Sequence, residues 1–221
     1  MSGRWTKDEA RREISAALLG EHPRAFFDAI DESHPCAPWL PQLLALRGVP
    51  QNPKYHPEGD AFEHTMLVIE EAAKVKDRAS DPLAFMLAAL THDLGKKVST
   101  CLNDKGNWTA IGHENTGVPL ISRMLRPLGY AHEMVEYCIN MCRLHMRVHT
   151  CFYGKAKAKS TNKIFVLSVC PQELALLAVC DARGKAGTNT GDEEEAYLRD
   201  RLEAFYDRPA SPQNEKKREE A

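Results

Sequence analysis

The stretch from Asp81 to Gly95, DPLAFMLAALTHDLG, constrains the fold of this chain more than any other. Aspartate stands at the N-cap position and proline at the first helical position, which predicts a helix that ends at the glycine. Its residues are apolar nearly all round, and such a helix belongs in the middle of a bundle. The chain is therefore expected to be built around a buried helix that ends in His92 and Asp93.

The rest of the sequence is helical in pattern almost throughout, without an internal repeat or a period-two strand pattern. Further helices are expected over residues 6–20, 23–31, 38–47, 60–76, 113–126, 130–147, 160–169, 171–183 and 192–207. Thr6 with Glu9, and Asp60 with Glu63, have the spacing of a capping box. Residues 96–111 are expected to form a polar connector with an Asn-Asp-Lys-Gly turn. The predicted fold class is all-α.

The composition limits the class of protein, the partners and the location that can be expected. The 221 residues are 43% hydrophobic and 27% charged with a net charge of −2, which is ordinary for a soluble globular protein and points to no nucleic-acid or membrane partner. No apolar run approaches the ~20 residues that span a bilayer, and no signal peptide is recognised, so a cytoplasmic location is expected. Seven scattered cysteines without a C-x-x-C pair are expected to be reduced thiols.

Three segments are expected along the chain. Residues 1–46 are predicted to form N-terminal helices that pack on the bundle, as a cap or a partner-binding pair, and residues 47–207 the main domain. The tail 208–221 is too polar to pack and is predicted to be disordered. The oligomeric state is left open.

A metal site is predicted from four residues at the ends of core-facing helices. His92 and Asp93 end the buried helix, His64 lies in the first turn of the helix 60–76, and Asp181 ends the apolar helix 171–183. Burial of a charge without a partner is costly, whereas a divalent cation accepts both imidazole nitrogen and carboxylate oxygen and offsets the carboxylate charge.

A second group of residues has open roles. His113 and His145 suit either a second ion or the positioning of a substrate phosphate around a single ion. His149, four residues after His145, is expected to line the cleft or the surface. Lys96 and Arg183 are candidates for phosphate contact, although Lys96 at a helix end also suits binding to helix-terminal carbonyls.

Residues 143–163 form a local basic stripe, without an acidic residue, that includes the aromatic residues Phe152 and Tyr153. Its cations are Arg143, Arg147, Lys155, Lys157, Lys159 and Lys163. Such a stripe suits a nucleotide or an RNA end, with phosphates paired and a base stacked. A solvated loop whose lysines maintain solubility is an equally good interpretation.

Four sequence blocks, in this order, resemble one known family. They are PQNPKYHPEGDAFEHT (50–65), ALTHDLGK (89–96), GHENTG (112–117) and DARGKAG (181–187). The chain resembles the HD superfamily of metal-dependent phosphohydrolases, and most closely the HD domain of bacterial CCA-adding tRNA nucleotidyltransferases. The resemblance implies a helical HD bundle, phosphate-ester hydrolysis, and metal ligation at His64, His92, Asp93 and Asp181.

The resemblance also implies a class of substrate. In the related tRNA enzymes the HD domain is associated with 2′,3′-cyclic phosphodiesterase, 2′-nucleotidase and phosphatase activity. The nucleotidyltransferase head, with its Gly-Ser turn and Asp-x-Asp carboxylates, is not recognised in the roughly 46 residues before the match, so CCA addition is not expected. The expected function is metal-dependent hydrolysis of a nucleotide-type phosphate ester, with one or two ions of manganese, nickel, cobalt, magnesium or iron.

Two alternatives stay open at this point. The chain is consistent with an RNA- or nucleotide-binding module that keeps the HD shell, and the basic stripe is the best support for this alternative. A di-iron oxygenase is a more distant alternative, since the six residues that it needs are present. The expected partner is a phosphorylated small molecule, a nucleotide or an RNA 3′ end.

Overall fold

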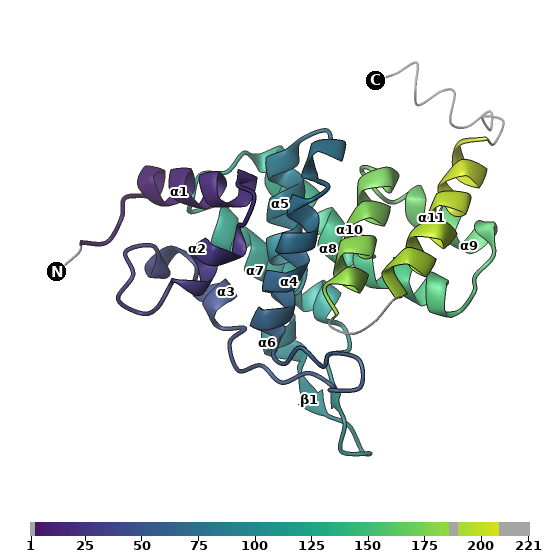
Figure 1. Cartoon of the computed structure of the whole chain (residues 1–221), viewed down its shortest axis with the longest axis horizontal. Helices are drawn as coiled ribbons and strands as arrows, with labels where there is room; N and C mark the ends of the chain where they lie inside the picture. Colours follow the sequence, from purple (N-terminus) through teal and green to yellow (C-terminus); the bar gives the residue numbers. More distant parts are fainter. Residues whose placement is uncertain (1–2, 186–189, 208–221) are drawn as a thin grey trace.

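Helix α5 (Pro82–Thr91) lies at the centre of the helical bundle (Figure 1). The computed structural model describes residues 3–185 and 190–207. Within this range α5 contacts α4 (Ala61–Ala73), α8 (His132–Tyr153) and α10 (Pro171–Arg183). The predicted cap is present, because the Asp81 carboxylate accepts hydrogen bonds from the backbone N–H groups of Leu83 and Ala84.

The other described elements surround this centre. They are α1 (Lys7–Leu19), α2 (Arg24–Asp28), η1 (Ala37–Trp39), α3 (Pro41–Leu44), η2 (Lys76–Arg78), α6 (Lys96–Ser99), α7 (His113–Leu125), α9 (Ala158–Phe165) and α11 (Thr190–Tyr206). Helices α1, α2 and α3 lie on one side of α4 and α5, and α9, α10 and α11 lie on the other (Figure 1). The all-α prediction is confirmed.

One hydrophobic core extends through both sides of the bundle. It includes Ala10 and Ile14 of α1, the apolar residues of α5, and Leu198 of α11. Helix α1 contacts α5, α2 contacts α4, and α3 contacts α7. In the described ranges no helix has the length and apolar character needed to cross a membrane. The tail 208–221 lies outside the described residues.

Two strands occur in the connector where none was predicted. Strand β1 (Cys101–Leu102) pairs with β2 (Trp108–Thr109) in antiparallel register, and the predicted Asn-Asp-Lys-Gly turn joins them. The strands are two residues long, too short for a period-two pattern to be visible in the sequence. This hairpin projects from the lower end of the bundle (Figure 1).

The end of α5 also differs from the prediction. The α-helix stops at Thr91, and His92, Asp93 and Leu94 lie in a turn before α6. Gly95 allows this turn to lie against α7, because a Cβ atom at Gly95 would be 1.9 Å from the His113 carbonyl oxygen. The two chemically active side chains are therefore held by a tight turn and not by a helical face.

The capping predictions had different outcomes. At α1 the capping box of Thr6 and Glu9 is present. At α4 Asp60 accepts a hydrogen bond from the Glu63 backbone N–H, but the Glu63 carboxylate makes a bidentate pair with Arg24 of α2 instead of completing the box. A tertiary ion pair has taken the place of the local hydrogen bond from the Asp60 backbone N–H to Glu63.

Candidate metal centre

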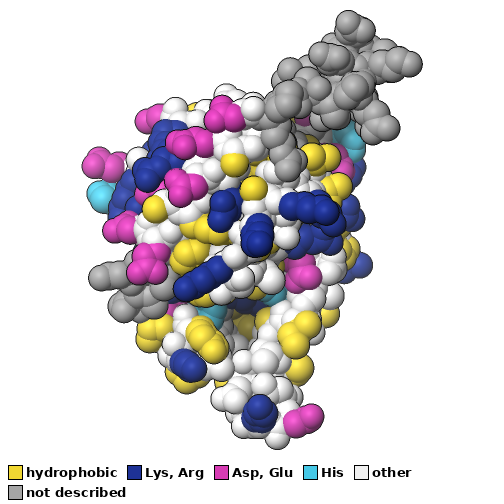
Figure 2. Space-filling view, turned by 90° about the vertical axis from the view of Figure 1, so that its right-hand side faces the viewer, with side chains coloured by type: hydrophobic (Ala, Val, Ile, Leu, Met, Phe, Trp, Pro, Cys, Tyr) yellow, Lys and Arg dark blue, Asp and Glu magenta, His cyan; other side chains and the backbone are white. Residues whose placement is uncertain are grey.

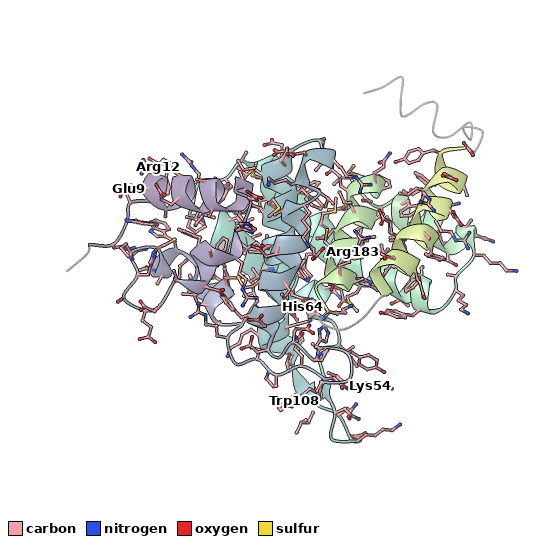
Figure 3. The ribbon with its side chains drawn as sticks, in the orientation of Figure 1. Glu9, Arg12, Lys54, His64, Trp108 and Arg183 are labelled. Atoms are coloured by element: carbon pink, nitrogen blue, oxygen red, sulfur yellow. The ribbon has the colours of Figure 1, made fainter. Side chains whose placement is uncertain are left out.

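The four predicted ligands come together at the end of the bundle where α5 and α10 finish. His64, His92, Asp93 and Asp181 are each at most 4% exposed. The His64 Nε2 atom lies 3.0 Å from Asp181 Oδ1 and 3.6 Å from Asp93 Oδ2, and the His92 Nε2 atom lies 3.2 Å from the same Asp93 oxygen. Figure 3 shows His64 at this lower end of α4.

His113 and His145 join the same cluster on the other side of Asp93. The His113 Nε2 atom lies 3.0 Å from Asp93 Oδ1 and 3.2 Å from His145 Nε2. Asp93 thus faces His64 and His92 with one oxygen and His113 and His145 with the other. The six side chains form two triads, each with ligand atoms within 4.8 Å of one another: His64, His92 and Asp181, and Asp93, His113 and His145.

The outer nitrogen of each of these four histidines faces an oxygen acceptor. For three of them the Nδ1 atom lies 2.6–2.8 Å from a backbone carbonyl oxygen, that of Ala89, Ala110 or Cys142. In His64 the Nδ1 atom lies 2.9 Å from the Glu58 carboxylate. Each Nδ1 position therefore favours the tautomer that carries its hydrogen there, which leaves the Nε2 lone pair directed into the cluster.

This arrangement places acceptors against acceptors. Two imidazole Nε2 lone pairs, those of His113 and His145, face each other at 3.2 Å, and that of His64 faces a carboxylate oxygen. His92 Nε2 and Asp93 Oδ1 are buried and make no hydrogen bond of acceptable geometry. Buried polar atoms are rarely left in this condition, and a divalent cation with mixed imidazole and carboxylate ligands satisfies all of them. The residues fit a metal ion.

Neighbouring side chains keep the carboxylates of the cluster ionised. Burial alone would raise the pKa of Asp93, but His92 and Lys96 outweigh it and hold that pKa well below the usual range. Burial likewise opposes ionisation of Asp181, and Lys185 and His149 hold its pKa well below the usual range. Both aspartates are therefore available as anionic ligands near neutral pH.

His149 is not on the surface or in an open cleft, contrary to the expectation, since only 2% of it is exposed. Its Nε2 atom lies 2.7 Å from Asp181 Oδ2 and its Nδ1 atom 2.8 Å from Glu194 of α11. Burial would lower the pKa of His149, but Asp181 and Glu194 raise it to about 9. His149 is thus a cation that orients Asp181, and Glu194 was missed because it belongs to an acidic run that resembles a solvated helix face.

The two predicted phosphate-binding cations have different surroundings. Lys96 is 6% exposed, and its Nζ atom lies 2.6 Å from both Asp93 Oδ2 and Gln51 Oε1. Arg183 is directed to α11 instead, where it pairs with Asp192 at 2.7 Å and Glu195 at 2.8 Å. Figure 3 shows Arg183 on α10, away from His64.

The loop before α4 contributes residues that were not singled out in the sequence. The Glu58 carboxylate receives His56 Nδ1 at 2.8 Å and His64 Nδ1 at 2.9 Å. Burial would raise the pKa of Glu58, but these two hydrogen bonds lower it. The available signal was their position inside the block 50–65, which carried the family resemblance.

The cations of the basic stripe are exposed and make no ion pair with the described part of the chain. The stripe begins on α8, which continues to Tyr153 and not to residue 147 as predicted, because Cys151 is buried in the core and Gly154 caps the helix. On the face in Figure 2, Lys and Arg side chains gather above a hollow with histidine at its base. The hairpin forms the lowest lobe below this hollow.

Comparison with known proteins agrees with this geometry. Residues 61–169 match the family model described as the HD domain, a span that contains five of the six clustered ligands. The chain contains an HD domain. The HD family is of the metal-dependent phosphohydrolase type, and the described residues include clusters of histidine and aspartate that could hold a metal ion.

Among curated proteins, the chain is similar to multifunctional CCA proteins. Multifunctional CCA proteins of Pasteurella multocida and Cupriavidus metallidurans are 34% identical over 187 residues and 36% identical over 204 residues. These matches cover 82% and 90% of this chain, but 44% and 47% of the relatives. The chain therefore spans less than half the length of the curated relatives that it matches.

Proposed function

We propose that this HD domain is a metal-dependent phosphohydrolase that acts on a nucleotide-type phosphate ester, as a phosphatase or a cyclic phosphodiesterase. The observation that carries the proposal is the set of inward-facing Nε2 atoms around two ionised aspartates, which leaves buried ligand atoms unsatisfied. The names of the relatives support a substrate of nucleotide or RNA type.

Two metal ions fit the donor set better than one. His64, His92 and Asp181 would hold the first ion, and Asp93, His113 and His145 the second. Asp93 has one oxygen close to His92 of the first group and the other close to His113 of the second. When bound, such divalent ions supply Lewis acidity toward a phosphate oxygen and make hydroxide available near neutral pH.

The protein's own groups have distinct tasks. Lys96 holds a fixed positive charge beside Asp93, where it stabilises negative charge that develops on phosphate oxygens. Glu58 orients His64, and the pair of His149 and Glu194 orients Asp181. Arg183 has no part in this proposal because Asp192 and Glu195 engage its guanidinium group.

The test is hydrolysis of 2′,3′-cyclic AMP by chelator-stripped protein. The protein is reloaded separately with manganese, nickel, cobalt, magnesium or iron, and Asp93→Ala protein is measured in parallel. Metal-dependent turnover that the variant lacks is the expected result. Equal turnover in stripped and reloaded protein would contradict the proposal.

The same samples separate the alternative functions. Salt-dependent RNA binding without hydrolysis of any phosphate ester, unchanged in His92→Ala protein, would favour a binding module that uses the exposed basic stripe. A visible absorption band of the iron-loaded protein together with oxygen uptake would favour a di-iron oxygenase. Neither outcome is expected of a phosphohydrolase.

A further inference from the structure

A cavity of about 510 Å³ lies between the loop 50–59 and the β1–β2 hairpin. Its size falls within the roughly 300–1,000 Å³ typical of small-molecule sites. Three prolines and two glycines form much of its wall, with the side chains of Gln51, His56, Asn107 and Trp108. No carboxylate, ammonium or guanidinium group of the described residues lines it. The cavity therefore suits an uncharged group with both flat and polar parts.

Trp108 provides an aromatic surface in this cavity. It is half-buried on β2, and neither its ring nor its indole N–H has a partner among the described residues. The other two tryptophans are both engaged: Trp39 donates a hydrogen bond to the Trp5 carbonyl, and Trp5 stacks on Phe26. A half-exposed indole that faces a cavity is available to stack on a planar ligand.

Asn107 adds a polar group beside this ring. Its backbone N–H donates to the Asn103 side chain and its carbonyl accepts from the Asn103 N–H, so its backbone position is fixed by the hairpin turn. Its side-chain amide makes no hydrogen bond with the described part of the chain. A primary amide offers a donor and an acceptor together, the combination that pairs with the edge of a nucleobase.

Two other side chains of the wall connect the cavity to the metal centre. Gln51 accepts a hydrogen bond from Lys96, whose ammonium group also contacts Asp93. His56 shares the Glu58 carboxylate with His64, and the two imidazole rings lie 4.8 Å apart. A ligand in the cavity thus lies next to the metal ligands, and Figure 3 shows Trp108 directly below His64.

We propose that this cavity is a nucleobase subsite, in which Trp108 stacks on the base and Asn107 binds its polar edge. The proposal rests on the proposed function and names its substrate class: nucleoside phosphates whose phosphate reaches the metal centre while the base occupies the cavity. Simple phosphate esters lack the group that the cavity binds. The enzyme is accordingly expected to prefer nucleoside phosphates through this subsite.

The test compares two substrates in metal-loaded full-length protein. For each variant, kcat/KM is measured for 2′,3′-cyclic AMP and for glycerol 1,2-cyclic phosphate, which has no aromatic ring, and the ratio of the two values is the readout. Trp108→Ala should lower this ratio by roughly 5- to 150-fold, the effect of one lost stacking contact, and Trp108→Phe should restore most of it. Tyr55→Ala, an exposed aromatic residue outside the cavity wall, is the matched control and should leave the ratio as it is.

A second measurement makes the subsite testable without catalysis. Adenosine, which carries no phosphate, is titrated into chelator-stripped protein by calorimetry, and binding that Trp108→Ala weakens at least five-fold is expected. Hydrolysis of both substrates with an unchanged ratio in Trp108→Ala would overturn the subsite while the proposed function stands. If no phosphate ester is hydrolysed, the proposed function fails, and absent or unaltered adenosine binding would overturn the subsite as well.

Discussion

The two ends of the helices α5, α8 and α10 each hold a buried carboxylate cluster. The two clusters differ in whether all their polar atoms have hydrogen-bond partners. At the start of α10, the Glu173 carboxylate accepts hydrogen bonds from the Ser80 N–H and hydroxyl groups at 2.7 Å and from the Tyr137 hydroxyl at 2.5 Å. Every partner there is a donor. At the far end of the same helices, His92 Nε2 and Asp93 Oδ1 make no hydrogen bond, and the Nε2 atoms of His113 and His145 face each other at 3.2 Å.

Helix direction contributes to this difference. Glu173 lies in the first turn of α10, where the helix dipole favours negative charge, whereas His92 and Asp181 of the metal centre lie at the C-terminal ends of α5 and α10 and His64 and His113 lie in the first turns of α4 and α7. A buried polar cluster that satisfies itself is explained by stability alone. One that leaves ligand atoms unsatisfied is explained by a bound ion.

Removal of the Asp93 carboxylate should have the largest effect on this contrast. Asp93→Ala takes away a carboxylate that lies close to histidines of both triads, so turnover of 2′,3′-cyclic AMP is expected to fall to the background of the assay. Circular dichroism should show the helical content retained. Asp200→Ala, an exposed aspartate of α11, is the control. Turnover of Asp93→Ala protein at the level of the control would contradict a role of Asp93 in the metal centre.

Loss of the fixed cation should have the next largest effect. Lys96→Met keeps an unbranched apolar side chain but removes the ammonium group beside Asp93. We expect kcat to fall by roughly 10²–10³-fold, as for loss of one transition-state donor, while metal stoichiometry is retained. Steady-state kinetics and calorimetry measure the two quantities. A change confined to KM would show that Lys96 binds substrate and transition state equally.

The orientation of His64 offers a graded test at the same end. Glu58→Ala removes the acceptor of the His64 Nδ1–H, and metal affinity is expected to fall by roughly 10–100-fold. Glu58→Gln retains an oxygen acceptor and should lose less. Titration calorimetry measures the manganese affinity of the native protein and of both variants. Equal affinities in all three would mean that the hydrogen bond to Glu58 does not affect metal binding.

Glu173→Gln should have the smallest effect on chemistry, because it alters the complete cluster. The NH2 group of the new amide would face the donor groups of Ser80 and Tyr137. The free energy of unfolding is therefore expected to fall by about 1–3 kcal/mol at pH 7, with metal affinity retained. Burial opposes ionisation of Glu173, but the hydrogen bonds from Ser80 and Tyr137 lower its pKa below the usual 4.5.

The pH dependence of this effect has a definite sign. A lowered pKa in the folded state contributes stability that is fully present above the unfolded value of 4.5 and is lost as the pH falls through the folded pKa. The stability difference between the native protein and Glu173→Gln should therefore shrink below pH 4.5. Urea unfolding at pH 7 and pH 4 measures it, and a difference that grows with acid would contradict the assignment.

Much of the fold was predictable because its signals are local. The N-cap aspartate and the apolar sequence of α5 placed it at the centre, and α10 has the predicted bounds of Pro171 and Arg183. The candidate ligands were found in the same way, as polar residues at the ends of apolar helices. Signals of this kind depend only on residues that are adjacent in the sequence.

The remaining features depend on residues far apart in the chain. Gln51 and Lys96 are separated by 45 positions, and no local pattern predicts that their side chains meet. His149 was expected to line the cleft or the surface, because its partner Glu194 belongs to another helix. Arg183 was expected near phosphate, but α11 supplies carboxylates that engage it. Tertiary packing decides all three.

The central claim is that the cluster at the ends of α5 and α10 is a metal centre, incomplete without its ions. Titration calorimetry of manganese into chelator-stripped protein, with metal content measured in parallel, tests it most directly. We expect two ions per chain in the native protein and in Glu173→Gln, and loss of binding in Asp93→Ala. Absence of binding, or equal binding in Asp93→Ala, would contradict it.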